Sequence, residues 1–123
     1  MHPHLTTVAH ERDVDRLIEE SRERPVLVFK HSYTCGVSAE ALEELVTHLE
    51  EEIADARYAI VTVQTHREAS NAIAARVGVR HHTPQAILIR DGRAIWSASH
   101  FRISAAEIRK ALAQALADAE GTG

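Results

Sequence analysis

PVLVFKHSYTCGVSAE, residues 25–40, is the stretch that indicates how this chain folds. Val26 to Phe29 are apolar and rich in strand-forming residues, which predicts a short central strand buried on both faces. After Cys35, apolar residues recur at helical spacing between acidic residues, which predicts a long helix. We expect the apolar stripe of that helix at Val37, Leu42, Leu45, Val46, Leu49 and Ile53. The single cysteine of the chain therefore lies where a buried strand gives way to a helix.

The same two kinds of pattern continue on both sides of this stretch. Helical spacing predicts further helices over residues 11–22, over residues 68–77 before Gly78, and after a capping-box pair, Ser104 and Glu107. Strand-like runs occupy residues 58–63 and both arms of a hairpin over residues 85–98, which turns at Asp91-Gly92. Strand-helix-strand units imply parallel pairing, and the hairpin adds antiparallel strands to the same sheet. The predicted fold is α/β, a mixed central sheet with helices on both faces, which is the layout of the thioredoxin fold.

Length and composition limit the classes of protein to consider. The 123 residues predict one domain, 1–123, in which about five N-terminal and four C-terminal residues are flexible. A net charge of −4 gives no sign of nucleic-acid or membrane partners, and no run approaches the ~20 apolar residues of a membrane span. A lone cysteine excludes an internal disulfide, which fits a cytoplasmic location. We expect a monomer.

Cys35 is the candidate nucleophile. Unpaired N–H groups and the helix dipole at the start of the following helix favour the thiolate over the thiol. Lys30 and His31 are close in sequence and add positive charge, and we expect Ser38 to hydrogen-bond the thiolate. The alternative is a small buried hydrophobe, which is what most free cysteines are. The polar residues 32–34 before Cys35 favour an accessible junction instead.

Other polar residues are candidates for ligand contacts. Thr83-Pro84 directly precedes a predicted strand, and its spacing leaves cis and trans bonds both open. Arg67 and Arg80 are each able to bind a carboxylate, or to be ordinary surface arginines. Four histidines are expected near Cys35, but their spacing matches no zinc pattern, so we predict no metal site. They are His31, His81, His82 and His100.

Several segments, taken in order, resemble one known family. They are Phe29-Lys30-His31-Ser32, Thr34-Cys35-Gly36-Val37-Ser38, residues 67–74, residues 79–85 and Ser99-His100-Phe101. Together they resemble the bacillithiol system redox-active proteins, monothiol bacilliredoxin-like members of the thioredoxin superfamily. The resemblance implies a thioredoxin fold, a single active cysteine at Cys35, a cis proline at Pro84, and removal of bacillithiol from protein mixed disulfides. Gly36 and Phe101 depart from it, since proline and tryptophan are expected at these two positions.

The resemblance and the residues together define the candidate site. We expect Cys35 and Ser38 of the CxxS motif to be catalytic. The candidate substrate-binding residues are Lys30, His31, Thr34, Gly36, Arg67, Thr83, Pro84 and His100. The expected partners are bacillithiolated client proteins and a low-molecular-weight thiol, with bacillithiol as co-substrate and no resident cofactor.

Two other functions remain open at this point. Cys-Gly-Val-Ser is close to the Cys-Gly-Phe-Ser of monothiol glutaredoxins, which carry iron–sulfur clusters, although Ser97 to His100 replace their glycine-rich glutathione site. A thioredoxin-fold interaction module without catalysis is the third possibility.

Overall fold

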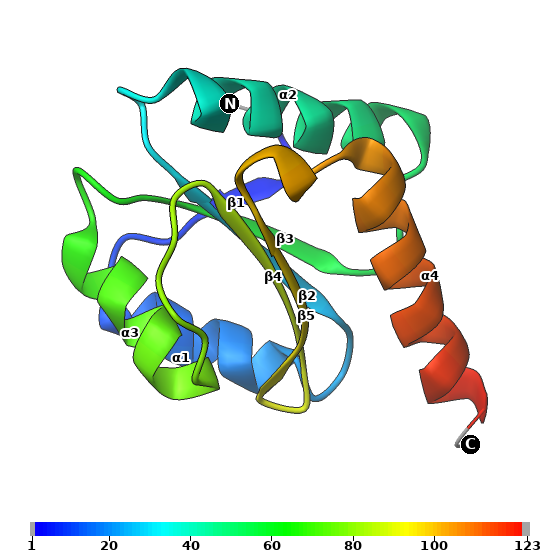
Figure 1. Ribbon diagram of the computed structural model, residues 1–123. Coiled ribbons are helices and arrows are strands. Elements are labelled where there is room, and N and C mark those ends of the chain that lie inside the picture. Colours follow the sequence, from blue (N-terminus) through cyan, green and yellow to red (C-terminus); the bar gives the residue numbers. More distant parts are fainter. Residues whose placement is uncertain (1, 122–123) are drawn as a thin grey trace.

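The chain forms a five-stranded mixed sheet with helices on both faces, as the sequence predicts (Figure 1). The computed structural model describes residues 2–121. The elements are β1 Leu5–Thr7, α1 Glu11–Glu20, β2 Val26–His31, α2 Gly36–Glu51, β3 Arg57–Thr62, α3 Arg67–Val77, β4 Gln85–Arg90, β5 Arg93–Ser99, the 3-10 helix η1 His100–Arg102 and α4 Ala105–Gly121. The strand order is β1-β3-β2-β4-β5, and β2 lies at the centre. It pairs parallel with β3 and antiparallel with β4.

Alternate residues of the central strands pack into two separate core layers, one on each face of the sheet. Leu27 and Phe29 of β2 face the layer that α2 and α4 cover, whereas Val26 and Val28 face the layer that α1 and α3 cover. The period of two in a strand produces this division, because successive side chains point to opposite faces. Lys30 continues the series of Val26 and Val28, and His31 continues that of Leu27 and Phe29. The two polar residues at the end of β2 therefore face opposite sides of the sheet.

Most predicted elements are confirmed, with two corrections. The first strand, β1, was not predicted; it pairs with β3 through residues 5–7, and Leu5 is buried. Leu5 therefore does not belong to a flexible end, while Met1 and residues 122–123 lie outside the described residues. The expected stripe of α2 is confirmed only in part, because Leu45 and Leu49 are buried and Leu42 packs against the core, whereas other residues complete the buried face of the helix. Its buried residues are Ser38, Ala41, Leu45, His48 and Leu49, and Ile53 lies beyond the helix with 44% of its surface exposed.

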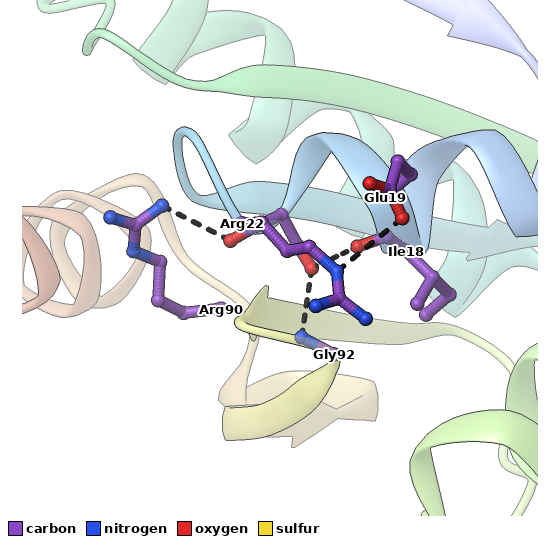
Figure 2. A network of polar contacts seen from close by, with 6 residues as sticks. Ile18, Glu19, Arg22, Arg90 and Gly92 are labelled. Atoms are coloured by element: carbon purple, nitrogen blue, oxygen red, sulfur yellow. Dashed lines mark hydrogen bonds and ion pairs between the residues drawn. The ribbon is translucent and has the colours of Figure 1, made fainter.

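The β4–β5 hairpin turns where it was predicted and is fixed to the end of α1. Asp91 and Gly92 have φ angles of 53° and 75°, so both lie in the left-handed region that a tight two-residue turn requires. Gly92 N–H donates to Ser21 Oγ at 2.9 Å, and the Ser21 hydroxyl donates to the carbonyl of Ile18. The Ser21 carbonyl accepts from Arg90 Nη1 at 3.0 Å and from the Asp91 N–H at 2.8 Å. Figure 2 shows Arg90 and Gly92 approaching α1 from the hairpin.

The last helix begins at the predicted cap. Glu107 N–H donates to Ser104 Oγ at 3.1 Å, and the flanking Ile103 and Ile108 are both buried. Glu44 of α2 accepts from the Ala105 N–H at 3.1 Å, so a side chain of the neighbouring helix also caps α4. Within residues 2–121, none of the helices combines the length and the apolar character needed to cross a membrane.

Candidate functional site

One edge of the sheet collects most of the candidate residues, and we call it the cysteine edge. Strands β2 and β3 run parallel and β4 runs against β2, so the ends of β2, β3 and β5 meet the start of β4 at this edge. Cys35 follows β2, Gln64 follows β3, Pro84 precedes β4 and His100 follows β5. The His100 N–H donates to the Pro84 carbonyl at 3.1 Å, which ties two of these segments together. The Thr83–Pro84 peptide bond is cis, as the resemblance implies.

Cys35 is the residue that immediately precedes α2. Its backbone is extended, with φ −114° and ψ 121°, and its carbonyl accepts the first helical hydrogen bond from the Ala39 N–H at 3.1 Å. The side chain is partly exposed. A sulfur at this position lies near the positive end of the helix dipole, although no side-chain hydrogen bond caps α2. The arrangement suits nucleophilic attack on a disulfide.

Ser38 does not make the expected hydrogen bond to the cysteine sulfur. Its side chain is fully buried, and its oxygen lies 2.8 Å from His31 Nδ1 and accepts from the Ser32 N–H at 2.9 Å. Ser38 is the first residue of the buried face of α2, so its hydroxyl points at the end of β2. Burial lowers the pKa of His31. Ser38 therefore fastens the start of α2 to the end of β2, and His31 is its partner rather than a free substrate contact.

Gln64 holds the loop in front of the cysteine, a role that the sequence did not reveal. Its Nε2 donates to Ser32 Oγ at 2.6 Å and to Thr34 Oγ1 at 3.1 Å. Its Oε1 accepts from the Tyr33 N–H at 3.4 Å. One amide side chain thus binds three consecutive residues that lead into Cys35. Thr34 itself is exposed beside the cysteine.

Lys30 is not a surface cation beside the sulfur. It lies within the ladder between Val61 of β3 and Gln85 of β4, and its side chain is fully buried. Burial lowers the pKa of Lys30 from 10.5 to about 8. Its Nζ lies 3.0 Å from His81 Nδ1, in the loop between α3 and β4. Lys30 consequently cannot touch a substrate directly, which corrects its expected role.

His81 links this buried amine to the residue before the cis proline. Its Nε2 lies 3.1 Å from Thr83 Oγ1. Gln85 keeps the loop in this position, because its Nε2 donates to the Arg80 carbonyl at 2.9 Å and its Oε1 accepts from the His82 N–H at 3.4 Å. A glutamine at the start of an apolar strand is the sequence signal for this second loop anchor.

The cysteine edge is cationic on the side of this loop. Burial lowers the pKa of His81, and the positive charges of Lys30, His82 and Arg67 lower it further. Arg67 is the first residue of α3 and is exposed, as is His100, whose ring lies 5.9 Å from that of His82. Anionic groups are attracted to such a cluster. Within residues 2–121, no three histidine, cysteine or carboxylate side chains are grouped to hold a metal ion.

On its other side the cysteine edge opens into an acidic groove. A cavity of about 430 Å³ lies between the first half of α2 and η1. Glu40, Glu43 and Glu44 line its α2 wall, and His100 and Phe101 line the opposite wall. Phe101, which replaces the expected tryptophan, is 79% exposed. Gly36 is exposed at the first position of α2.

Comparison with known proteins places this geometry in a family. The family model described as Monothiol bacilliredoxin BrxC matches residues 6–108. The chain belongs to the monothiol bacilliredoxin family. Among solved structures, a candidate oxidoreductase with a thioredoxin fold is 30% identical to this chain, with a TM-score of 0.77, and the match covers 87% of this chain and 92% of the other. Thus a thiol redox role, with thiol-modified proteins as clients, follows from the family and the fold.

More distant structures support the fold alone. Thioredoxin from Fasciola hepatica is 24% identical to this chain with a TM-score of 0.69, and the match covers 89% of this chain and 98% of the thioredoxin. Thioredoxin from Trypanosoma brucei brucei is 15% identical with a TM-score of 0.72, covering 94% of each chain. The predicted thioredoxin fold is confirmed.

Proposed function

We propose that this protein removes bacillithiol, or a similar low-molecular-weight thiol, from mixed disulfides on client proteins. The observation that carries the proposal is the pair formed by Cys35 and Ser38. Cys35 is partly exposed at the start of α2, whereas the residue three positions later has no sulfur and is buried against His31. A thiol group that reaches Cys35 therefore has to leave to an external thiol.

The proposed reaction is one thiol–disulfide exchange followed by a second. The Cys35 thiolate attacks the bacillithiol sulfur of the modified client. A new disulfide forms between Cys35 and bacillithiol, the original disulfide breaks, and the client cysteine leaves as a thiolate that takes up a proton. A second, free bacillithiol molecule then attacks the sulfur of the bacillithiol that is bound to Cys35. This step releases the disulfide of two bacillithiol molecules and restores the Cys35 thiolate. No external oxidant is needed.

The charges around the sulfur suit this substrate. Bacillithiol carries the two carboxylates of its malate group. The loop side of the cysteine edge presents Arg67 and His82, and His100 lies between this loop and the groove. Arginine binds a carboxylate through two parallel hydrogen bonds. The client chain then occupies the other side, where the groove between α2 and η1 lies. The exposed Thr34 and Gly36 flank Cys35 in the chain.

The test is a single-turnover experiment on a bacillithiolated client protein. The wild type alone should release reduced client in stoichiometric amount and gain one bacillithiol on Cys35, as measured by intact mass. Turnover should require added free bacillithiol and a reductant for its disulfide. Cys35→Ser should release nothing. Ser38→Cys is the matched variant, because it adds a sulfur at the resolving position; it should clear the adduct and form an internal disulfide.

Two outcomes would contradict the proposal. Client release by Cys35→Ser would show that the cysteine is not the nucleophile. A wild type that neither releases client nor gains an adduct would favour the interaction module without catalysis. The iron–sulfur alternative makes a different prediction, namely a brown anaerobic preparation with cluster absorbance. Exchange with a glutathionylated client but not with a bacillithiolated one would keep the mechanism and change the co-substrate.

A further inference from the structure

The buried amine of Lys30 has an unusual partner. Lysines that are fully buried in proteins are normally paired with a carboxylate. Here Lys30 Nζ lies 3.0 Å from the Nδ1 atom of His81, and within residues 2–121 that is the one hydrogen-bond partner the structure gives it. A carboxylate would hold the ammonium in place and do little else. An imidazole has a second nitrogen and can pass a proton onward.

The hydrogen bonds fix how His81 carries its proton. An ammonium group only donates, so Nδ1 of His81 must accept from Lys30. A neutral imidazole that accepts at Nδ1 carries its proton on Nε2. That Nε2 lies 3.1 Å from Thr83 Oγ1, so it donates to the hydroxyl oxygen. The hydroxyl proton of Thr83 is then left free to donate to a further group.

Thr83 lies at the same end of the sheet as Cys35. Lys30 of β2 pairs directly with Gln85 of β4, so the two strands enter the cysteine edge side by side. Beyond that pair, β2 leads to Cys35 and β4 is preceded by Thr83. The two residues therefore border the same opening of the sheet from adjacent strands.

We propose that Lys30, His81 and Thr83 form a proton relay. The relay protonates the thiolate that is released when Cys35 attacks a disulfide. The inference rests on the proposed function, since it needs disulfide exchange at Cys35. As the disulfide breaks, the Thr83 hydroxyl gives its proton to the departing sulfur and takes the Nε2 proton of His81. His81 Nδ1 takes a proton from Lys30. The step ends with a neutral amine, the other imidazole tautomer and a neutral thiol, and water restores the proton through the same chain.

The surrounding charges favour this direction of transfer. The charged groups that act on His81 are cationic, namely Lys30 from β2, Arg67 from α3 and His82 from its own loop, and they lower the pKa of His81. His81 is therefore neutral near pH 7 and able to accept. The pKa of Lys30, about 8, is close to that of an ordinary thiol, about 8.5, so the transfer costs little. Thr83 touches the leaving group, whereas Lys30 and His81 act through it.

The test compares two uncharged disulfides that differ in the leaving group. 2,2′-Dithiodipyridine releases a resonance-stabilised thione, which needs no proton on sulfur, whereas bis(2-hydroxyethyl) disulfide releases an alkyl thiolate, which does. Adduct formation on Cys35 is followed by intact mass in the wild type and in Lys30→Met. We expect the alkyl disulfide to react about 10-fold more slowly in Lys30→Met, a modest effect because a thiolate is already a fair leaving group. The aromatic disulfide should react at an unchanged rate.

Thr83 variants and pH supply the controls. Thr83→Val should reproduce the selective loss, and Thr83→Ser, which keeps a hydroxyl, should retain the wild-type ratio of the two rates. The wild-type advantage with the alkyl disulfide should also disappear as the pH rises above about 8, where Lys30 has no proton to give. Equal slowing of both disulfides, or no change in either, would overturn the relay while leaving exchange at Cys35 intact. A wild type inert toward both disulfides would instead overturn the proposed function, and the relay with it.

Discussion

Replacing Gly36 by proline should stabilise the protein, although proline usually breaks helices. Gly36 is the first residue of α2, where the missing N–H of proline removes no helical hydrogen bond and its fixed φ suits the helix. A residue before proline is restricted to extended backbone, and Cys35 already has φ −114° and ψ 121°. Apart from its chain neighbours and the adjacent backbone of α2, no atom lies within 4 Å of the position that a Cβ would take at Gly36. The substitution therefore meets neither steric nor hydrogen-bonding resistance in the folded protein.

The expected gain comes from the unfolded chain. Proline removes most of the backbone freedom that Gly36 has when unfolded, and a compatible substitution of this kind stabilises by about 0.4–1 kcal/mol. For a domain of this size, 1 kcal/mol corresponds to a rise of about 4 °C in Tm. Thermal and urea unfolding, followed by circular dichroism, measure both quantities.

Gly78 provides a matched control for this reasoning. A Cβ at Gly78 also has no atom within 4 Å apart from its chain neighbours, but φ there is +68°, in the left-handed region. Alanine at position 36 should therefore stabilise, whereas alanine at position 78 should destabilise by about 1 kcal/mol. If Gly36→Pro lowers the free energy of unfolding, or if both alanine variants change it in the same direction, backbone conformation does not decide the outcome at these sites.

Two other predictions follow from the site. Lowering the pKa of Lys30 from 10.5 to about 8 corresponds to a cost of about 3 kcal/mol below pH 8, so Lys30→Met should gain up to about 3 kcal/mol in urea unfolding at pH 7. Because the unfolded chain holds this proton up to pH 10.5, wild-type stability should rise from pH 8 to pH 10.5 relative to Lys30→Met, and a difference independent of pH would refute the assignment. Gln64→Ala should cost about 1–2 kcal/mol and speed amide hydrogen exchange at Tyr33, whereas Gln64→Glu, which keeps an acceptor for that N–H, should protect it. Unchanged amide hydrogen exchange at Tyr33 in Gln64→Ala would show that the loop before Cys35 keeps its conformation without Gln64.

The helices and strands of this protein were largely predictable because their signals are local. Apolar runs, the Asp91-Gly92 turn and the Ser104 cap each lie within a few residues and report on their own element. Strand β1 has no such signal, since three residues form a strand only because β3 offers an edge to pair with. The buried face of α2 was predicted only in part. Ser38 and His48 are polar residues on the buried face, and side chains from β2 and β3 satisfy them, which a hydrophobic pattern cannot show.

The candidate site was predictable in its position but not in its contacts. Cys35 could be placed at the cysteine edge because a strand and a helix meet there. The partners of Lys30 and of the loop before Cys35 come from segments about 51 and 32 residues away. Such pairs depend on sheet register, which brings β3 and β4 beside β2. Sequence spacing around the cysteine carries no information on them.

The clamp between Ser21 and the hairpin turn has a consequence for the order of folding. The hairpin is a local structure with a two-residue turn, and such hairpins form in about 1–10 μs. Ser21 and Gly92 are 71 residues apart, so their hydrogen bond has to wait until the intervening strands have closed a long loop. Contacts that form after the transition state slow unfolding without speeding folding. We therefore expect the clamp to form late in folding and to slow unfolding, so that it lengthens the lifetime of the native state without directing the chain toward it.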